Sequence, residues 1–188
     1  MDARVHHLQA EAERLTFSPE RLVTHAKADD LAILSDIHRD KLAARQRHVA
    51  VARHVSDYEF NNTYQYVIGR EDTHLQWLEA AIADLGGTPA SIEEPAVTPS
   101  SGKAADRFLP LVAEDAQAAT ALVGKWRPRL DEIGSERHRK MVNLMLGETL
   151  EQQRFFEHAL AGRADLLGRR SSSGAPPAGE VLPARWLE

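Results

Sequence analysis

Arg70-Glu71-Asp72-Thr73-His74-Leu75 is the stretch that decides the fold, and it lies in the middle of a long helical pattern. Glu71 and His74 are three residues apart, so a helix projects the carboxylate and the imidazole from one face. That face is apolar, because residues such as Tyr64 and Leu78 share it. Burying two such polar groups is costly unless a partner satisfies both, and a metal ion is such a partner. The pair therefore predicts a metal site inside a helical protein.

The composition restricts the class of protein. The chain has 188 residues, which suits one domain with a sizeable core. Its 23 basic and 28 acidic residues nearly balance and form no basic stripe with interleaved aromatic residues, so nucleic acid is not an expected partner. No apolar run approaches the ~20 residues of a membrane span, and the first residues lack the apolar core of a signal peptide. We therefore expect a cytoplasmic protein with no membrane partner. The absence of cysteine leaves only oxygen and nitrogen ligands for a metal.

The first half of the chain predicts a short helix and two long ones. Strand-like alternation is absent, and strong helix formers dominate the periodic stretches. Ser18-Pro19 predicts the start of a short helix that ends at about residue 25, within an N-terminal extension of residues 1–28. A long helix is expected from about residue 29 to 54. The next helix opens at the capping-box pattern Ser56-Asp57-Tyr58-Glu59 and stops at Gly86-Gly87.

The second half predicts two more helices after a long connection. Residues 88–103 contain three prolines and form that connection. A third helix is expected over about 104–127, with Pro110 leaving its true beginning open, and a fourth runs from the N-cap Ser135 to about residue 167. Residues 169–188 are rich in Ser, Gly, Pro and Ala, which is typical of a flexible tail. Two short links and one long crossover predict an all-α four-helix bundle of two antiparallel hairpins over residues 29–168.

Further ligand candidates lie at the depth of Glu71 on the other helices. Asp40 is about as far before the first helix link as Glu71 is after it, and it shares a face with Ile33 and Ile37. The alternative for Asp40 is an ion pair with a neighbouring basic residue, Lys41 or Arg47, on a solvated face.

The same reasoning on the second hairpin gives Glu148, followed three residues later by Glu151. An ordinary surface ion pair with Arg154 is the alternative for Glu151. On the third helix the depth matches Glu114 or Asp115, which cannot both face inward on a regular helix. Asp115 fits the apolar stripe better, whereas Glu114 has the usual side-chain length. Glu114 is slightly favoured, and Asp115 stays open.

These residues resemble the ferritin-like superfamily of di-iron carboxylate proteins, and its rubrerythrin-like branch most closely. The resemblance is carried by Asp40, by Glu71-x-x-His74 and by Leu85-Gly86-Gly87-Thr88-Pro89, and it covers about residues 30–168. It implies a ferritin-like bundle in which Glu71 and Glu148 bridge two ions. In that template His74 with Asp40 holds one ion, and Glu114 with Glu151 holds the other. The chain departs from the pattern at two ligands, since Asp40 stands where Glu is usual and Glu151 where His is usual.

The resemblance implies two iron ions, or manganese, that react with O2 or peroxide. The expected activity is oxidation of iron or another di-iron oxidoreductase reaction of the ferroxidase, peroxidase or oxygenase type. Tyr64 is expected either to donate a hydrogen bond to a ligand carboxylate or to be a plain core residue. Because the chain has no cysteine, we expect no rubredoxin domain, and the resemblance then implies an external electron donor.

The alternative function is a ferritin-like helical interaction or cargo module with a degenerate or mononuclear metal site and no turnover. The apolar stretch Val181–Glu188 supports this alternative, because a flexible spacer before an apolar anchor is how docking peptides are built. For either function we expect a homodimer or larger homo-oligomer. Apolar residues near one bundle end, Val55, Tyr58 and Phe60, are expected to be exposed and to allow it.

Overall fold

The computed structural model describes residues 19–101, 103, 106–163 and 165–167, with side chains from residue 27 onward. Within these residues the chain is all helical and has no strand. The elements are α2 (Pro19–Ala52), α3 (Tyr58–Asp84), α4 (Leu109–Trp126), the 3-10 helix η1 (Arg127–Glu132) and α5 (Glu136–Leu160). None of the described helices is long and apolar enough to cross a membrane. The predicted tail, residues 169–188, lies outside the described residues.

Helix α2 is one uninterrupted element of 34 residues, so the predicted break between residues 25 and 29 is wrong. Asp29 and Asp30 suggested a new helix start because aspartate is favoured at N-caps. Asp30 instead binds the turn before α5, since its buried carboxylate accepts hydrogen bonds from the backbone N–H groups of Gly134 (2.6 Å) and Ser135 (3.0 Å). This contact fastens α2 to the turn that leads into α5.

Helix α3 begins and ends close to its expected limits. Asp57, rather than Ser56, is the N-cap residue, and its side chain accepts a hydrogen bond from the N–H of Phe60 at 3.0 Å. The helix stops where Gly86 adopts a φ of 86°, a conformation that glycine takes without steric cost. A Cβ atom at Gly87 would lie 2.4 Å from Leu31 of α2, so a glycine there lets the two helices approach each other closely.

The second pair of helices is shorter than the sequence predicted. Helix α4 starts at Leu109 rather than near residue 104, with Pro110 at its first turn, where proline costs no hydrogen bond. Ser135 caps α5 as expected, accepting from the N–H of His138 at 3.4 Å. The helix ends at Leu160 rather than near residue 167, and Gly162 follows with a φ of 69°.

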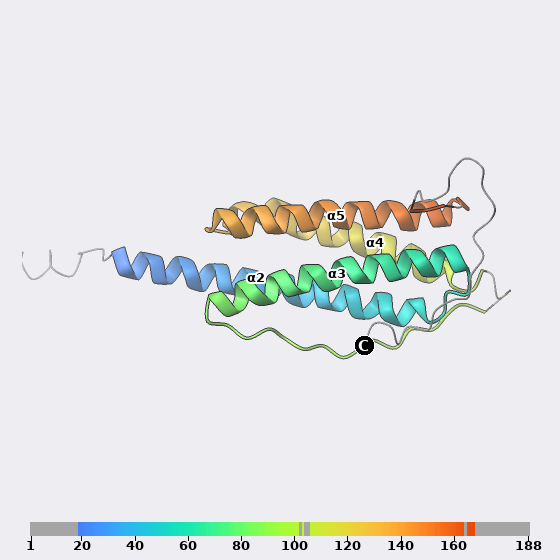
Figure 1. Cartoon of the computed structure of the whole chain (residues 1–188), viewed down its shortest axis with the longest axis horizontal. Coiled ribbons are helices and arrows are strands. Elements are labelled where there is room, and N and C mark those ends of the chain that lie inside the picture. The colour runs from blue at the N-terminus through green and yellow to red at the C-terminus, as the bar shows by residue number, and fades with distance from the viewer. Residues whose placement is uncertain (1–18, 102, 104–105, 164, 168–188) are drawn as a thin grey trace, which may run out of the picture.

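The four helices form a bundle in which α2 lies beside α3 and α4 lies beside α5 (Figure 1). The segment between α3 and α4 runs back along the length of the bundle. It is held to α2 by the side-chain amide of Gln46, which donates to the carbonyl of Ile92, and by the ion pair of Arg53 with Glu94.

The apolar core consists of two separate clusters, one toward each end of the bundle. The first contains Val51, Tyr64 and Phe156, and the second contains Leu34, Leu78 and Met145. Val55, expected to be exposed, is only 2% exposed and belongs to the first cluster. Tyr58 and Phe60 are half-buried, and the Phe60 ring packs against Phe108 with centroids 5.4 Å apart. That end of the bundle therefore offers less free apolar surface than expected.

Candidate functional site

A layer of buried polar side chains separates the two apolar clusters. Each of the four helices contributes to it, which is the arrangement that the sequence predicted for a ligand set. The buried polar members are Lys41 and His48 of α2, Glu71 and His74 of α3, Asp115 of α4, and Thr149 and Gln152 of α5. Because they are removed from water, each needs a partner within the protein.

Lys41 occupies the centre of this layer and is the partner of Glu71. Its ammonium group donates to Glu71 Oε1 at 3.2 Å and to the hydroxyl of Thr149 at 3.4 Å. The other carboxylate oxygen of Glu71 lies 2.8 Å from Nδ1 of His48. The side chains of Lys41 and Glu71 are each 1% exposed. A positive side chain of the chain itself therefore stands where the sequence predicted a metal ion.

These contacts determine the ionisation of Glu71. Burial disfavours the carboxylate, but the attraction of His48 and Lys41 outweighs burial and lowers the pKa of Glu71 to about 2. Burial also opposes the charged form of His48, yet Glu71 overcomes this and raises the pKa of His48. Glu71 is thus a carboxylate at neutral pH, held by two cationic or cation-forming partners.

His74 of α3 contacts Glu148 of α5 at the edge of the layer, where Arg70 binds the same carboxylate. Nε2 of His74 lies 2.9 Å from Glu148, and Arg70 binds the same carboxylate with contacts of 2.6 to 2.9 Å. Burial, with the nearby charge of Lys41, lowers the pKa of His74 to about 4. The imidazole is therefore neutral near pH 7 and donates to Glu148, while its buried Nδ1 has no hydrogen-bond partner among the described residues.

Asp115 is the inward-facing acid of α4, and Glu114 is exposed. The Tyr64 hydroxyl donates to Asp115 Oδ2 at 2.5 Å, and Nε of Arg47 lies 2.6 Å from Oδ1. Arg47 also binds Glu114 at 2.8 Å. Burial and the charge of Asp115 raise the pKa of Tyr64 well above its usual value, so Tyr64 stays a hydrogen-bond donor. Of the two expectations for Tyr64, donation to an inward carboxylate is the one realised.

Asp40 and Glu151 lie apart from the layer. One carboxylate oxygen of Asp40 accepts from the ammonium of Lys125 at 2.6 Å and from the indole N–H of Trp126 at 2.7 Å. Asp40 is thus bound to the end of α4, not to Glu71. Glu151 is exposed on the surface of α5.

The structure thus places Glu71 and His74 in the layer and Glu148 at its edge, in contact with His74, whereas Asp40, Glu114 and Glu151 lie outside it. Across the described ranges, no three acidic or histidine side chains are grouped so that they could hold a metal ion.

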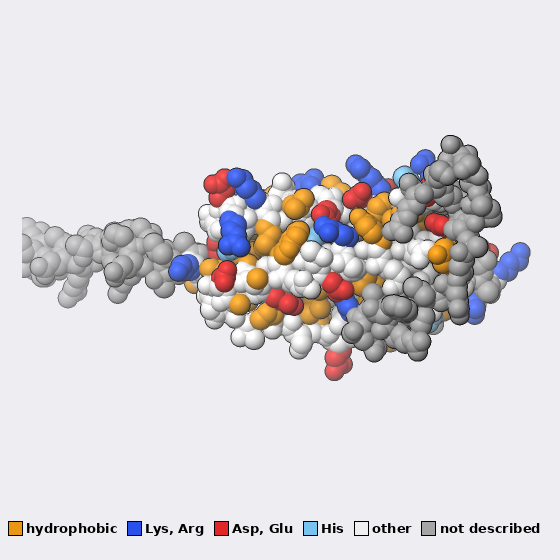
Figure 2. Space-filling model, in the orientation of Figure 1, with side chains coloured by type: hydrophobic (Ala, Val, Ile, Leu, Met, Phe, Trp, Pro, Cys, Tyr) orange, Lys and Arg blue, Asp and Glu red, His pale blue; other side chains and the backbone are white. Residues whose placement is uncertain are grey.

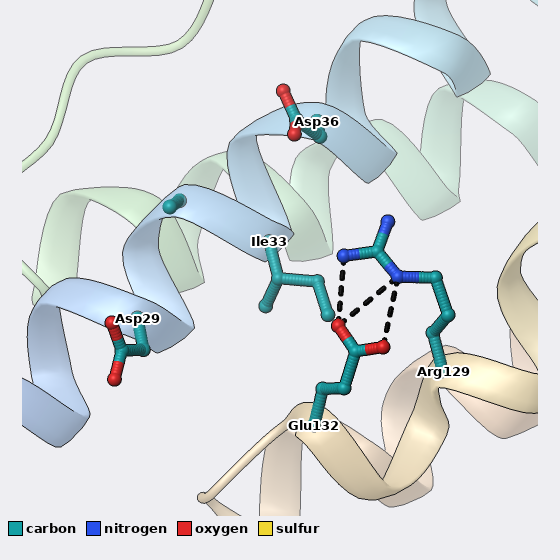
Figure 3. Close-up of a pocket in the computed structure, with 6 residues that line it drawn as sticks. Asp29, Ile33, Asp36, Arg129 and Glu132 are labelled. Atoms are coloured by element: carbon teal, nitrogen blue, oxygen red, sulfur yellow. Dashed lines mark hydrogen bonds and ion pairs between the residues drawn. The ribbon is translucent and has the colours of Figure 1, made fainter.

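A separate pocket of about 360 Å³ lies between α2 and η1 and contains no residue of the layer. Figure 3 shows Ile33 directed toward the ion-paired side chains of Glu132 and Arg129, with Asp29 and Asp36 at the rim. Because the carboxylate of Glu132 is already bound by Arg129 and that of Asp36 by Arg39, the pocket offers no free acidic pair.

Comparison with family models, with curated proteins and with solved structures gave no match.

The sequence did not predict the partners of the inward acids. Lys41 and His48 bind Glu71, Arg47 binds Asp115, and Thr149 accepts a hydrogen bond from Lys41. A helical repeat links Leu34, Ile37, Lys41 and His48 on the buried face of α2. That repeat was the available signal.

Proposed function

We propose that this chain is a ferritin-like four-helix module of two antiparallel hairpins that acts through its surface, as a helical interaction protein without redox turnover. The observation that carries this proposal is the contact between the Lys41 ammonium and the buried Glu71 carboxylate. The layer that a ferritin-like protein would devote to metal ions is neutralised here by basic side chains.

The donor set does not fit a dinuclear metal centre. Each inward or flanking acid already has a basic partner: Asp40 has Lys125, Glu71 has Lys41, Asp115 and Glu114 have Arg47, and Glu148 has Arg70. A divalent ion beside Glu71 would also lie next to the Lys41 ammonium. Like charges about 4 Å apart repel by several kcal/mol even at an intermediate dielectric constant. Two ions would therefore require Lys41 to leave a site from which water is excluded.

A functional role at the surface is supported by large apolar side chains that the core does not use. Leu144 is 52% exposed and Tyr66 is 37% exposed, on α5 and α3 respectively. Exposed apolar groups gathered on one face are typical of a binding surface.

The competing proposal is the dinuclear iron or manganese oxidoreductase, with O2 or peroxide as the second substrate. One observation favours it: Glu71 and His74 are buried between the helices, and the half-buried Glu148 contacts His74. A site that binds a single metal ion on the same residues is a simpler version of this proposal.

Elemental analysis separates the two proposals. Protein is produced in medium supplemented with iron and manganese, purified without chelators and measured by mass spectrometry of the metals. We expect well under one ion per chain, and the same result for the Glu71→Gln variant. One to two ions per chain in the parent, lost in Glu71→Gln and Glu148→Gln while helicity is retained, would establish the metal centre and overturn the proposal.

A further inference from the structure

We propose that two copies of this chain associate through the outer seam between α3 and α5, about a two-fold axis parallel to these helices. The seam is formed by Tyr66, Arg70 and Trp77 of α3 and by Leu144, Glu148 and Phe155 of α5. This surface deepens the interaction role proposed above and rests on it.

The seam has an apolar group at each end and an ion pair in the middle. Arg70 binds Glu148, and the rings of Tyr66 and Phe155 lie 5.9 Å apart on one side of that pair. Trp77 and Leu144 lie on the other side, since each is displaced along its helix in the opposite direction from Tyr66 and Phe155. Figure 2 views this face, on which hydrophobic side chains gather on both sides of a basic and an acidic group.

The two helices repeat the same spacing along the seam. Arg70 follows Tyr66 by four residues and precedes Trp77 by seven. Glu148 likewise follows Leu144 by four and precedes Phe155 by seven. At about 1.5 Å of rise per residue, the two apolar seam residues of each helix are about 16 Å apart along the helix axis. These pairs are Tyr66 with Trp77 on α3 and Leu144 with Phe155 on α5, and each pair lies on one side of the bundle.

This arrangement is complementary to itself in one orientation. A two-fold interface brings the same patch of both copies together, so the patch must match its own rotated image. Rotation about an axis parallel to the helices places α3 of one copy against α5 of the other at the same height. Arg70 then faces Glu148 of the second copy, Tyr66 faces its Phe155, and Trp77 faces its Leu144.

The alternative two-fold orientation is disfavoured by charge. An axis across the helices would place α3 against α3 and Arg70 against Arg70 of the second copy, which is repulsive. Charge complementarity at the centre of the seam therefore selects both the partner, a second copy of this chain, and the register.

Sedimentation equilibrium of the full chain and of two matched variants tests this interface. The parent at about 100 µM should be a dimer, because this concentration populates even a weak association. Leu144→Glu should weaken dimerisation at least 100-fold, because both copies lose an apolar contact and gain a buried charge. Leu160→Glu changes the other exposed leucine of α5, 40% exposed and outside the seam, and should leave the dimer intact. Circular dichroism checks that both variants keep the helical content of the parent.

The register is tested by cross-linking, for which the cysteine-free chain is well suited. With an added mild thiol oxidant to accept the two electrons, Tyr66→Cys chains mixed with Phe155→Cys chains should form a disulfide-linked dimer, and Tyr66→Cys chains mixed with Leu144→Cys chains should not. A monomeric parent, or a Leu144→Glu variant that dimerises like the parent, would overturn the interface. These outcomes are independent of the metal content, so failure of the interface and failure of the metal-free proposal can be told apart.

Discussion

Replacing Lys41 by methionine isolates the charge on which the polar layer depends, because methionine is similar in length but carries no ammonium. Lys41 and Glu71 are each 1% exposed, and the distance between their charged atoms is 3.2 Å. Removing one partner of a buried ion pair leaves an uncompensated charge and costs about 3–5 kcal/mol. His48 still contacts Glu71 in the variant, so we expect the lower end of this range, about 3 kcal/mol.

The free energy of unfolding near neutral pH is measured by chemical denaturation, followed by far-ultraviolet circular dichroism. A domain of this kind has a free energy of unfolding of about 5–15 kcal/mol, so a loss of about 3 kcal/mol is well resolved. Lys140→Met is the matched control, because Lys140 is 77% exposed and pairs with Glu136 one turn away on the same helix. The control should change stability by less than about 0.5 kcal/mol.

The double variant Lys41→Met/Glu71→Gln distinguishes charge from packing. Removing both charges leaves a neutral pair, and such replacements are often close to neutral in stability. We expect the double variant to recover most of the stability that Lys41→Met loses. If the free energy of unfolding of Lys41→Met lies within about 0.5 kcal/mol of that of the parent, then Lys41 is not the counter-ion that neutralises Glu71.

Three further outcomes follow from the same contacts. Tyr64→Phe should cost about 1–3 kcal/mol in denaturation experiments, because Asp115 loses a hydrogen bond in a buried site, whereas Tyr66→Phe on the exposed seam should cost little. Asp30→Ala should destabilise the protein by about 1–2 kcal/mol, since it removes the acceptor for two backbone N–H groups of the turn before α5, and amide hydrogen exchange in that turn should become faster. Burial lowers the folded-state pKa of His74 to about 4, below the usual histidine value of 6.5. The unfolded chain therefore takes up a proton first, and stability should fall as the pH is lowered from about 6.5 to 4, by up to about 3 kcal/mol from this group. Replacing His74 by glutamine should flatten this part of the curve of stability against pH.

The sequence predicted the helical architecture well because the signals for it are local. The apolar stripe of α3 was read correctly from Tyr64 through Glu71 to Ile82, all of which are buried. The Gly86-Gly87 stop and the Ser135 cap also lie where their turn chemistry placed them. The wrong limit within α2 involves a contact distant in sequence. Asp30 reaches a turn more than 100 residues away.

The site was predicted only in part, and one helical position accounts for much of the difference. Asp40 was placed inward because it follows Ile33 and Ile37, but the buried face of α2 continues through Lys41. One residue corresponds to about 100° of rotation on a helix, so choosing between neighbours changes which side chain enters the core. Lysine and aspartate are both among the residues least often buried, so residue type alone does not choose between these neighbours.

Charge balance would have recovered Lys41 once Glu71 was taken to be buried. A carboxylate in the core needs a positive partner, and either a metal ion or a basic side chain satisfies that need. A ligand set made of acids and histidines represents only the first solution for Glu71. The α2 segment Lys41–His48 contains residues suited to either solution within about two turns. The imidazole of His48 could bind a metal ion, and the side chains of Lys41 and Arg47 are positively charged counter-ions. Lys41 forms an ion pair with Glu71 of α3, and Arg47 forms one with Asp115 of α4. The basic residues of this one segment therefore neutralise acids from both helices. Basic residues of one helix therefore supply the positive charge that the buried carboxylates of Glu71 and Asp115 need.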